Sequence, residues 1–307
     1  MTAAAASATI ASMLNELSNQ MADAVDAVAA SVVQVQGHRR PASGLVYGEG
    51  LVLTTMRAIG GDEGLHVRRH DGTALDAELA GWDPATTLAV LRVKDLNVPA
   101  LKPSSTAPRV GHLALAVARS WSNSLTASAG IISVIGGPLR TGRRRAIDQV
   151  IRTTAPMHEG FSGGAFIDST GGLTGVTTAT TIRGTTVVIP AGIAWAAAQR
   201  VLERGQTRQG YLGLMGQPVT LSASQAASTG RESALLVVGV VPSSAAASAG
   251  VLVGDILLAL DGTSTVSPDD LLDLLATQSV GRQATLKLLR GNTAVDMPVT
   301  IGERPAR

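Results

Sequence analysis

Apolar residues recur in steps of three and four near the start of the chain. They stand at Leu14, Leu17, Met21, Val25 and Val28. This spacing gathers them on one face of a helix, and residues 1–12 before them predict a flexible tail. From Ser31 the period shortens to that of strands. The pattern therefore predicts a tail and short helix over 1–30, followed by a β-rich region.

The β-rich region contains two sets of short strands, separated by a loop rich in Pro, Ser and Thr at about 98–109. The first set is expected at 31–36, 44–47, 51–53 and 88–93, with a hairpin turn at Asp71-Gly72. The second set is expected at 113–117, 130–134, 149–153, 173–176 and 185–189. Many short strands at such spacing favour antiparallel barrels or sandwiches over βαβ units.

The pattern turns helical after Pro190, and Gly205 supplies the expected stop. Residues 205–210 are interpreted as a linker. A compact region follows, with strands expected at 235–241, 256–260 and 284–289. Its helix is announced by Ser267-Pro268-Asp269-Asp270, which combines a capping serine, proline at the first helical position and an acid three residues after the cap.

Composition supports a globular chain and narrows its chemistry. Of the 307 residues, 45% are hydrophobic and 16% charged, whereas only 2% are aromatic, so the cores must be aliphatic. The net charge is +2, and the basic clusters at Arg39-Arg40, Arg68-Arg69 and Arg143–Arg145 are short and lack interleaved aromatics. We interpret them as solvated loop charge and expect no nucleic-acid partner.

The sequence does not decide in which cellular compartment the protein resides. The absence of cysteine excludes disulfides and thiolate metal sites. The Ala-rich N-terminus lacks the features of a signal peptide, and no run approaches the roughly 18 apolar residues of a membrane span. The sequence as given is therefore expected to be cytoplasmic, but a chain trimmed of an export signal would look the same and would be extracytoplasmic.

The segment Gly160-Phe161-Ser162-Gly163-Gly164 carries the most chemistry. It resembles the nucleophile loop of trypsin-like serine proteases, G-x-S-G-G. Its glycines permit a sharp turn, after which the amides of Gly160 and Ser162 would face one reacting carbonyl as an oxyanion hole. A serine hydroxyl is a weak nucleophile and needs a base to take its proton.

Further segments extend the resemblance to the HtrA/Deg family over about residues 13–304. They are Ser43–Thr54, Asp83–Leu91, Ala129–Ser133, Gly210–Gly213 and Ala249–Asp255. The resemblance implies a mainly β fold: a trypsin-like double antiparallel β-barrel over 31–204, with barrel one to about 100 and barrel two from about 109. A PDZ domain of α+β type over 211–304 follows the linker.

Two departures from the family pattern concern proton transfer. Arg57 stands where the family has its histidine, and Thr87 replaces the aspartate. A guanidinium stays protonated at physiological pH and cannot act as the base. We therefore expect a catalytically inactive homologue. The alternative is an active endopeptidase that uses Ser162 with a non-standard base or a group from a partner, and a third reading is a structural subunit that mixes with active relatives.

Other candidate groups are weaker. His158 and Glu159 replace the usual Asn-Pro; His158 lies four residues before Ser162 and is a candidate base, although a loop histidine is more often a hydrogen-bonded surface group. Ser162 itself is interpreted as a small polar residue that the loop retains. His66 and His70 would lie about 13 Å apart on a strand, too far to share a metal. We expect neither a metal nor a cofactor.

The PDZ-like region keeps more of its working parts. PDZ domains bind an extended C-terminal peptide as an added strand. By resemblance, the loop and strand that receive it are Tyr211, Leu212, Gly213, Leu214 and Met215, and the helix supplies Leu271, Leu272 and Leu275. Expected partners are apolar C-terminal or unfolded segments of client proteins, as in protein quality control; packing against the barrels is the alternative. The family also implies a trimer built on N-terminal aromatics, which this chain almost lacks.

Overall fold

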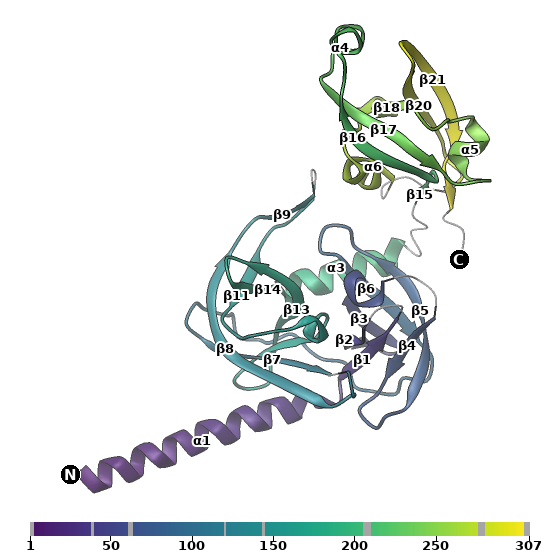
Figure 1. Cartoon of the computed structure of the whole chain (residues 1–307). Helices are drawn as coiled ribbons and strands as arrows, with labels where there is room; N and C mark the ends of the chain where they lie inside the picture. The colour runs from purple at the N-terminus through teal and green to yellow at the C-terminus, as the bar shows by residue number, and fades with distance from the viewer. Residues whose placement is uncertain are drawn as a thin grey trace. The chain divides into compact units, whose positions relative to one another are not determined.

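The computed structural model describes residues 3–37, 40–60, 64–119, 121–142, 145–204, 210–275 and 280–303. The chain forms two compact units, the first of Met1–Thr141 with Ala146–Gln206 and the second centred on Thr207–Arg307. Strands dominate both units (Figure 1). The predicted mainly β fold is confirmed.

The first unit contains a closed six-stranded barrel, in the order β1-β2-β3-β6-β5-β4. Its strands are β1 (Val32–Gln36), β2 (Ala42–Gly48), β3 (Leu51–Thr55), β4 (Leu65–Arg68), β5 (Ala74–Trp82) and β6 (Leu88–Val93). The predicted hairpin at Asp71-Gly72 joins β4 to β5, where Arg68 faces Ala74. The short helix α2 (Met56–Ile59) directly follows β3 and carries Arg57.

A second closed barrel follows, in the order β11-β14-β13-β12-β7-β8. Its strands are β7 (Leu113–Arg119), β8 (Leu125–Gly136), β11 (Val150–Thr153), β12 (Ala165–Asp168), β13 (Leu173–Ile182) and β14 (Thr185–Pro190). The pair β9 (Leu139–Gly142) and β10 (Arg145–Ile147) forms a separate two-stranded sheet. Helix α3 (Ala191–Arg204) begins directly after Pro190, as the period change predicted.

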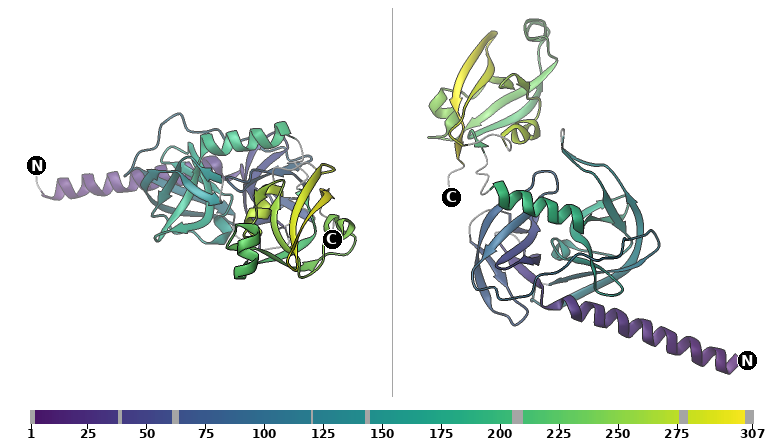
Figure 2. Two further views of the ribbon diagram at one scale, coloured as in Figure 1. Left: turned by 90° about the horizontal axis from the view of Figure 1, so that it is seen from above. Right: turned by 180° about the vertical axis from the view of Figure 1, so that it is seen from behind.

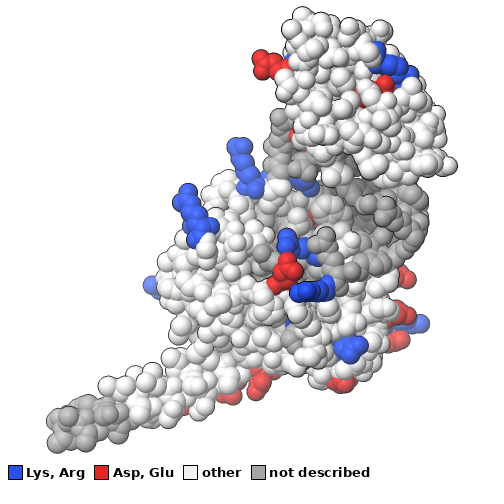
Figure 3. Space-filling model, viewed as in Figure 1, with Lys and Arg blue, Asp and Glu red and all other residues white. Residues whose placement is uncertain are grey.

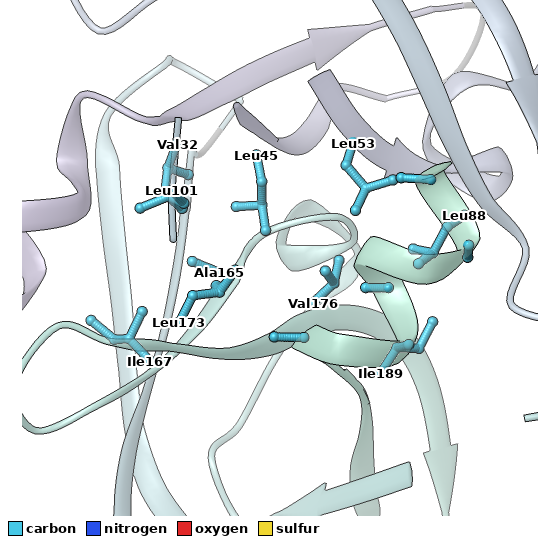
Figure 4. Close-up of a cluster of buried hydrophobic side chains, with 14 of the residues drawn as sticks. Val32, Leu45, Leu53, Leu88, Leu101, Ala165, Ile167, Leu173, Val176 and Ile189 are labelled. Carbon is cyan, nitrogen blue, oxygen red and sulfur yellow. The ribbon is translucent and has the colours of Figure 1, made fainter. Parts of the chain in front are cut away.

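Aliphatic side chains from both barrels form one shared core. Leu45, Leu53 and Leu88 come from the first barrel and meet Val176 and Ile189 of the second (Figure 4). All five are buried almost completely. Among the described residues, the buried members of this core are aliphatic, as the composition predicted, and the aromatic side chains of Tyr47 and Trp195 pack against it. The core sets the two barrels side by side with the candidate serine loop between them.

The N-terminal helix is longer than the sequence pattern predicted. Helix α1 runs from Ala3 to Ala29, so the flexible tail expected over 1–12 is wrong from Ala3 onward. Alanine is the strongest helix former, and the early segment is rich in it. Figures 1 and 2 show α1 extending away from the barrels toward the N-terminus.

Arg119 anchors the other end of α1. Its buried guanidinium donates to three backbone oxygens, those of Ala29 at 2.6 Å, Val32 at 2.9 Å and Asn123 at 3.2 Å. Burial lowers the pKa of Arg119. These hydrogen bonds satisfy the last carbonyl of α1 and the first of β1, so the helix end is held at the barrel.

The second unit is a five-strand path, β16-β17-β18-β20-β21, with β19 added beside β18. Its strands are β15 (Gly210–Tyr211), β16 (Leu214–Thr220), β17 (Ser233–Val240), β18 (Ile256–Leu260), β19 (Thr263–Ser264), β20 (Gln283–Arg290), β21 (Thr293–Thr300) and β22 (Gly302–Glu303). Its helices are α4 (Ala223–Thr229), α5 (Ala245–Ala249) and α6 (Pro268–Leu275). The expected cap of α6 is present: Asp270 N donates to Ser267 Oγ, and Ser267 N donates to Asp270 Oδ2.

Several sequence expectations concern absent features. Among the described residues, no three histidine or acidic side chains gather as a metal site, and His66 pairs instead with Asp76 at 3.0 Å. No helix in the described ranges is long and apolar enough to cross a membrane. On the face drawn in Figure 3, basic side chains are scattered rather than gathered into a patch. His38, Arg39, Arg143, Arg144 and linker residues 205–209 lie outside the described residues.

Candidate functional site

The serine loop is held between the two barrels by backbone hydrogen bonds. Ser162 O accepts from Ser43 N of β2 at 3.0 Å, and Gly163 N donates to Thr177 O of β13 at 2.9 Å. Gly163 has a φ of +83°, and a Cβ there would clash with the carbonyl oxygen of Ser43. The loop therefore requires glycine at this position, because both the turn and the close approach to β2 exclude a side chain.

The Ser162 hydroxyl is bonded to another hydroxyl. Ser162 is 2% exposed, and its Oγ lies 2.8 Å from Thr55 Oγ1. Thr55 caps the N-terminus of α2, where its Oγ1 also accepts from Ala58 N at 3.2 Å. A threonine hydroxyl is not a base at physiological pH, so this pair gives Ser162 no route for its proton.

Arg57 and Thr87 do not complete a catalytic triad. Arg57 Nη2 forms an ion pair with Glu159 Oε1 at 2.8 Å, and both side chains are mostly exposed. Thr87 is exposed, has a φ of +59°, and uses its carbonyl oxygen to accept from Met56 N at 2.9 Å. Among the described contacts, neither side chain bonds to Ser162. The two substituted positions thus have structural contacts of their own.

The expected oxyanion hole is not formed in this structure. A short 3₁₀ helix, η1 (Glu159–Phe161), turns both candidate amides inward. Gly160 N donates to His158 Nδ1 at 3.0 Å, and Ser162 N donates to Glu159 O at 3.0 Å. Ser43 Oγ donates to Gly160 O at 2.8 Å, which fixes the orientation of the Gly160–Phe161 peptide. Neither amide is available to a substrate oxygen in this arrangement.

His158 is the N-cap of η1, not a partner of Ser162. Its ring packs edge-on against Phe161, with 5.0 Å between ring centroids, and against Trp121, with 6.3 Å. Arg40 lies over the Trp121 ring, 4.8 Å from its centroid. Because Nδ1 of His158 accepts from Gly160, the candidate rescue base is occupied in holding the loop.

A small polar hollow remains above the serine. Its volume is about 280 Å³, and it is lined by Arg40, Ala42, Arg57, Ala58, Glu159 and Ser162. It holds two guanidinium groups and one carboxylate, in contrast to the hydroxyl, imidazole and carboxylate that the resemblance implies for an active site. The two guanidinium groups stay protonated and cannot accept a proton. The side chains of this hollow are therefore suited to polar contacts with a bound group and not to proton abstraction.

The second unit places the predicted peptide loop at a sheet edge. Gly213 has a φ of +76°, and a Cβ there would clash with the Ser244 side chain. The carbonyls of Leu212 and Gly213 accept from Ala246 N and Val241 N, both at 2.7 Å. The amides of Leu212 and Gly213 have no hydrogen-bond acceptor among the described residues. These amides are the groups that would receive a carboxylate.

The side chains around this loop divide into core and surface. Met215 on β16 is 57% exposed and Leu272 on α6 is 51% exposed, and α6 contacts β16. Leu212, Leu271 and Leu275 are buried in the core of this unit, so the expectation that Leu271 and Leu275 line an open pocket is not supported. Tyr211 and Leu214 are half-buried. The helical period of α6 explains the division. Leu271 and Leu275 are four residues apart and therefore share the face that packs on the core, whereas Leu272 lies off that face.

Two contact residues, Thr55 and Ser43, were not singled out from the sequence, and Glu159 was noted only as a departure from the family pattern. Thr55 holds the Ser162 hydroxyl, Ser43 holds the Gly160 carbonyl, and Glu159 holds Arg57. Thr55 carried a weak signal, since a threonine before a short helical turn is a typical cap. Ser43 and Glu159 gave none, because their partners are more than a hundred residues away along the chain.

Comparison with known proteins finds relatives of both units. The family model of the trypsin-like peptidase domain matches residues 42–176, and that of the PDZ domain matches residues 236–290. A probable periplasmic serine endoprotease, DegP-like, from Brucella suis is 31% identical over 284 residues, which cover 88% of this chain. The solved HtrA-type protease AlgW with decapeptide is 27% identical, with a TM-score of 0.56 over 94% of this chain and 99% of that one. The chain thus has the domain order of an HtrA-type protease, a trypsin-like peptidase domain followed by a PDZ domain.

Other HtrA relatives show similar agreement. The periplasmic pH-dependent serine endoprotease DegQ of Escherichia coli K12 is 31% identical over 82% of this chain. The serine endoprotease structure from Yersinia pestis is 28% identical, with a TM-score of 0.56 over 94% of this chain and 98% of that one. The chain spans about half the length of the curated relatives it matches, 54% of the Brucella protein and 57% of DegQ.

Proposed function

We propose that this HtrA homologue is proteolytically inactive and binds C-terminal or unfolded segments of client proteins through its PDZ groove. The observation that carries the first half is the pairing of Ser162 with Thr55 in place of an imidazole. The position that the family uses for the base holds Arg57, whose guanidinium is paired with Glu159.

The expected loss of activity is large. Removing the base of a serine triad costs on the order of 10⁶ in turnover. The remaining activity of such variants, roughly 10³ to 10⁴ over water, comes from the oxyanion hole and substrate binding. Here Gly160 N and Ser162 N donate within the loop, so that remainder is reduced as well. The site supports binding rather than hydrolysis.

The peptide-binding half rests on the second unit. Among the described strands, β16 pairs with β17 alone, which leaves its other edge facing α6 for an added strand. The amides of Leu212 and Gly213 have no acceptor among the described residues and suit a terminal carboxylate. Met215 and Leu272 offer apolar walls. The related AlgW structures were solved with a decapeptide and with a tripeptide, which supports peptide binding by this chain.

Fluorescence anisotropy with labelled peptides and the full chain tests the proposal that the PDZ groove binds peptides. Peptides ending in a free apolar residue are expected to bind, and the same peptides with an amidated C-terminus are expected to lose at least about tenfold in affinity. Met215→Asp and Leu272→Asp should each weaken binding by a similar factor. Leu252→Asp is the matched control, because Leu252 is equally exposed but lies on the turn after α5. Equal affinity for free and amidated ends would contradict the proposal.

The rival function is endopeptidase activity, and the relatives carry that name. It would require Ser162 to obtain a base from a partner or from a rearranged loop. Cleavage of unfolded casein separates the two. Cleavage that disappears in Ser162→Ala would establish the rival, whereas cleavage that persists in Ser162→Ala would come from a contaminant.

A further inference from the structure

The hollow above Ser162 has room for one functional group rather than for a whole ligand. Its volume is about 280 Å³, whereas pockets that enclose a small molecule begin at roughly 300 Å³. Two of its lining side chains, those of Arg57 and Glu159, are 60% and 64% exposed, so the hollow is reached directly from solvent. These dimensions suit a single group that projects from a larger molecule.

The lining of the hollow carries an excess of positive charge. Arg40 and Arg57 contribute two positive charges and Glu159 contributes one negative charge, which leaves one positive charge over. A single carboxylate would bring the hollow to neutrality. A phosphate group carries about −1.5 to −2 charges, and it would leave unbalanced negative charge beside Glu159. The charge balance therefore favours a carboxylate.

Both arginines have N–H groups left to donate. Arg57 Nη2 donates to Glu159 Oε1 at 2.8 Å, and no other acceptor bonds to the Arg57 side chain among the described residues. Arg40 lies over the Trp121 ring, 4.8 Å from its centroid, and within the described ranges it has no carboxylate partner. A guanidinium has five N–H donors in a planar fork that matches the two oxygens of a carboxylate.

The Ser162 hydroxyl can supply one more donor. Ser162 Oγ and Thr55 Oγ1 lie 2.8 Å apart, and either of them can donate to the other. Thr55 Oγ1 already accepts from Ala58 N at 3.2 Å. When Thr55 donates its own proton to Ser162 Oγ, the Ser162 proton is left for an oxygen bound in the hollow that this residue lines. A serine without a base is a poor nucleophile but remains a hydrogen-bond donor.

We propose that the hollow lined by Arg40, Arg57, Glu159 and Ser162 is a carboxylate-binding site that receives one acidic group of a polypeptide. The same substitution that removes the proton acceptor supplies the charge that holds the anion, because a guanidinium at position 57 stays positive where an imidazole would titrate. The site lies within the barrel unit, and it does not depend on the PDZ groove. Each of the two sites can therefore be tested while the other is left intact.

A pair of labelled peptides distinguishes a carboxylate from its neutral isostere. Both peptides carry an uncharged dye, are acetylated and amidated at their ends, and differ only in a central glutamate or glutamine. In anisotropy titrations of the full chain at low ionic strength, the glutamate peptide is expected to bind at least about tenfold more tightly. This preference should disappear in Arg40→Gln with Arg57→Gln. Arg109→Gln with Arg183→Gln is the matched control, because both residues are exposed and neither lines the hollow.

Glu159→Gln provides a readout in the opposite direction. It removes the competing negative charge and releases Arg57, so the glutamate peptide should bind about threefold to tenfold more tightly than to the wild type. An ion pair with a structural role alone would give no such gain. Ser162→Ala should weaken binding about fivefold, because one hydrogen bond is lost. Equal affinity of the wild type for the two peptides would overturn the proposal, as would a preference that survives in Arg40→Gln with Arg57→Gln.

A third peptide identifies the source of the carboxylate. It has the central glutamine and a free C-terminus, and it is titrated into Met215→Asp with Leu272→Asp, whose added charges disfavour binding in the PDZ groove. Binding that is lost when Arg40→Gln and Arg57→Gln are added assigns the hollow to terminal carboxylates as well. Binding of the glutamate peptide alone assigns it to acidic side chains. If neither carboxylate-bearing peptide binds, the proposal is wrong, whatever the PDZ groove does.

Discussion

The Oγ of Ser162 lies 2.8 Å from Oγ1 of Thr55, and both residues are buried. In a serine protease the corresponding hydroxyl faces an imidazole that takes its proton. Here it faces a helix-capping hydroxyl that already accepts from Ala58 N. The serine is thus part of a structural contact between β3 and the 3₁₀ turn η1, and its retention in the sequence has a reason other than catalysis.

A double-mutant cycle on Ser162 and Thr55 measures this contact. Ser162→Ala and Thr55→Val should each destabilise the barrel unit, with a coupling of about 1 kcal/mol because one buried hydrogen bond is lost in either variant. Thr55→Val should cost about 1 kcal/mol more, since it also removes the cap of α2. Urea unfolding gives the free energies. Strictly additive losses would show that the hydroxyl pair contributes nothing to stability.

Restoring the two missing triad residues should not restore proteolysis. Arg57→His with Thr87→Asp supplies the proton chemistry, and aspartate tolerates the positive φ at Thr87. Gly160 N, however, still donates to His158 Nδ1. Adding His158→Ala frees this amide and should raise the rate of peptide-ester hydrolysis by about 10²-fold over the double variant. A double variant already as fast as the triple one would show that the loop does not limit activity.

Acid should destabilise the second unit through Asp255. Its carboxylate is almost fully buried and accepts from Arg290 at 2.7 and 2.8 Å and from Leu252 N at 2.8 Å. The hydrogen bonds from Arg290 lower the pKa of Asp255, and the Leu252 amide adds to the shift. A lowered folded-state pKa stabilises the fold above the unfolded value, near 4, and this contribution is lost as pH falls further through the folded value.

Asp255→Asn checks the assignment. The variant should be less stable than the wild type at neutral pH, and its stability should change less between pH 5 and pH 2 because the titrating group is gone. Thermal unfolding across that range, followed in the full chain, provides the measurement. If the wild type and Asp255→Asn lose stability in parallel on acidification, another carboxylate carries the effect.

Much of the fold followed from local sequence pattern. Most strands of both barrels and the start of α6 could be predicted, because period-two alternation and the Ser267–Asp270 cap act over a few residues. Strand β12 (Ala165–Asp168) was not predicted. The start of α1 was missed because its first turns have alanine propensity but no apolar period. Pattern alone also left open which leucines of α6 are core, and Leu272 proved to be the exposed one.

The candidate site was less accessible to sequence reasoning. Arg57 and Thr87 could be recognised as departures because the motifs around them are intact. The contacts of Ser162 and Arg57 could not be predicted, since the partner of Ser162 lies 107 residues away and that of Arg57 lies 102 residues away. The inward turn of the Gly160 amide depends on the His158 ring, a side-chain geometry that spacing does not report.

Active-site labelling tests the central claim most directly. A fluorophosphonate reacts with a serine only when that serine is activated by a base and an oxyanion site. The account predicts that the purified chain stays unlabelled at Ser162 under conditions that label an active trypsin-like protease, and that Ser162→Ala behaves identically. Rapid labelling that maps to Ser162 and vanishes in Ser162→Ala would contradict it.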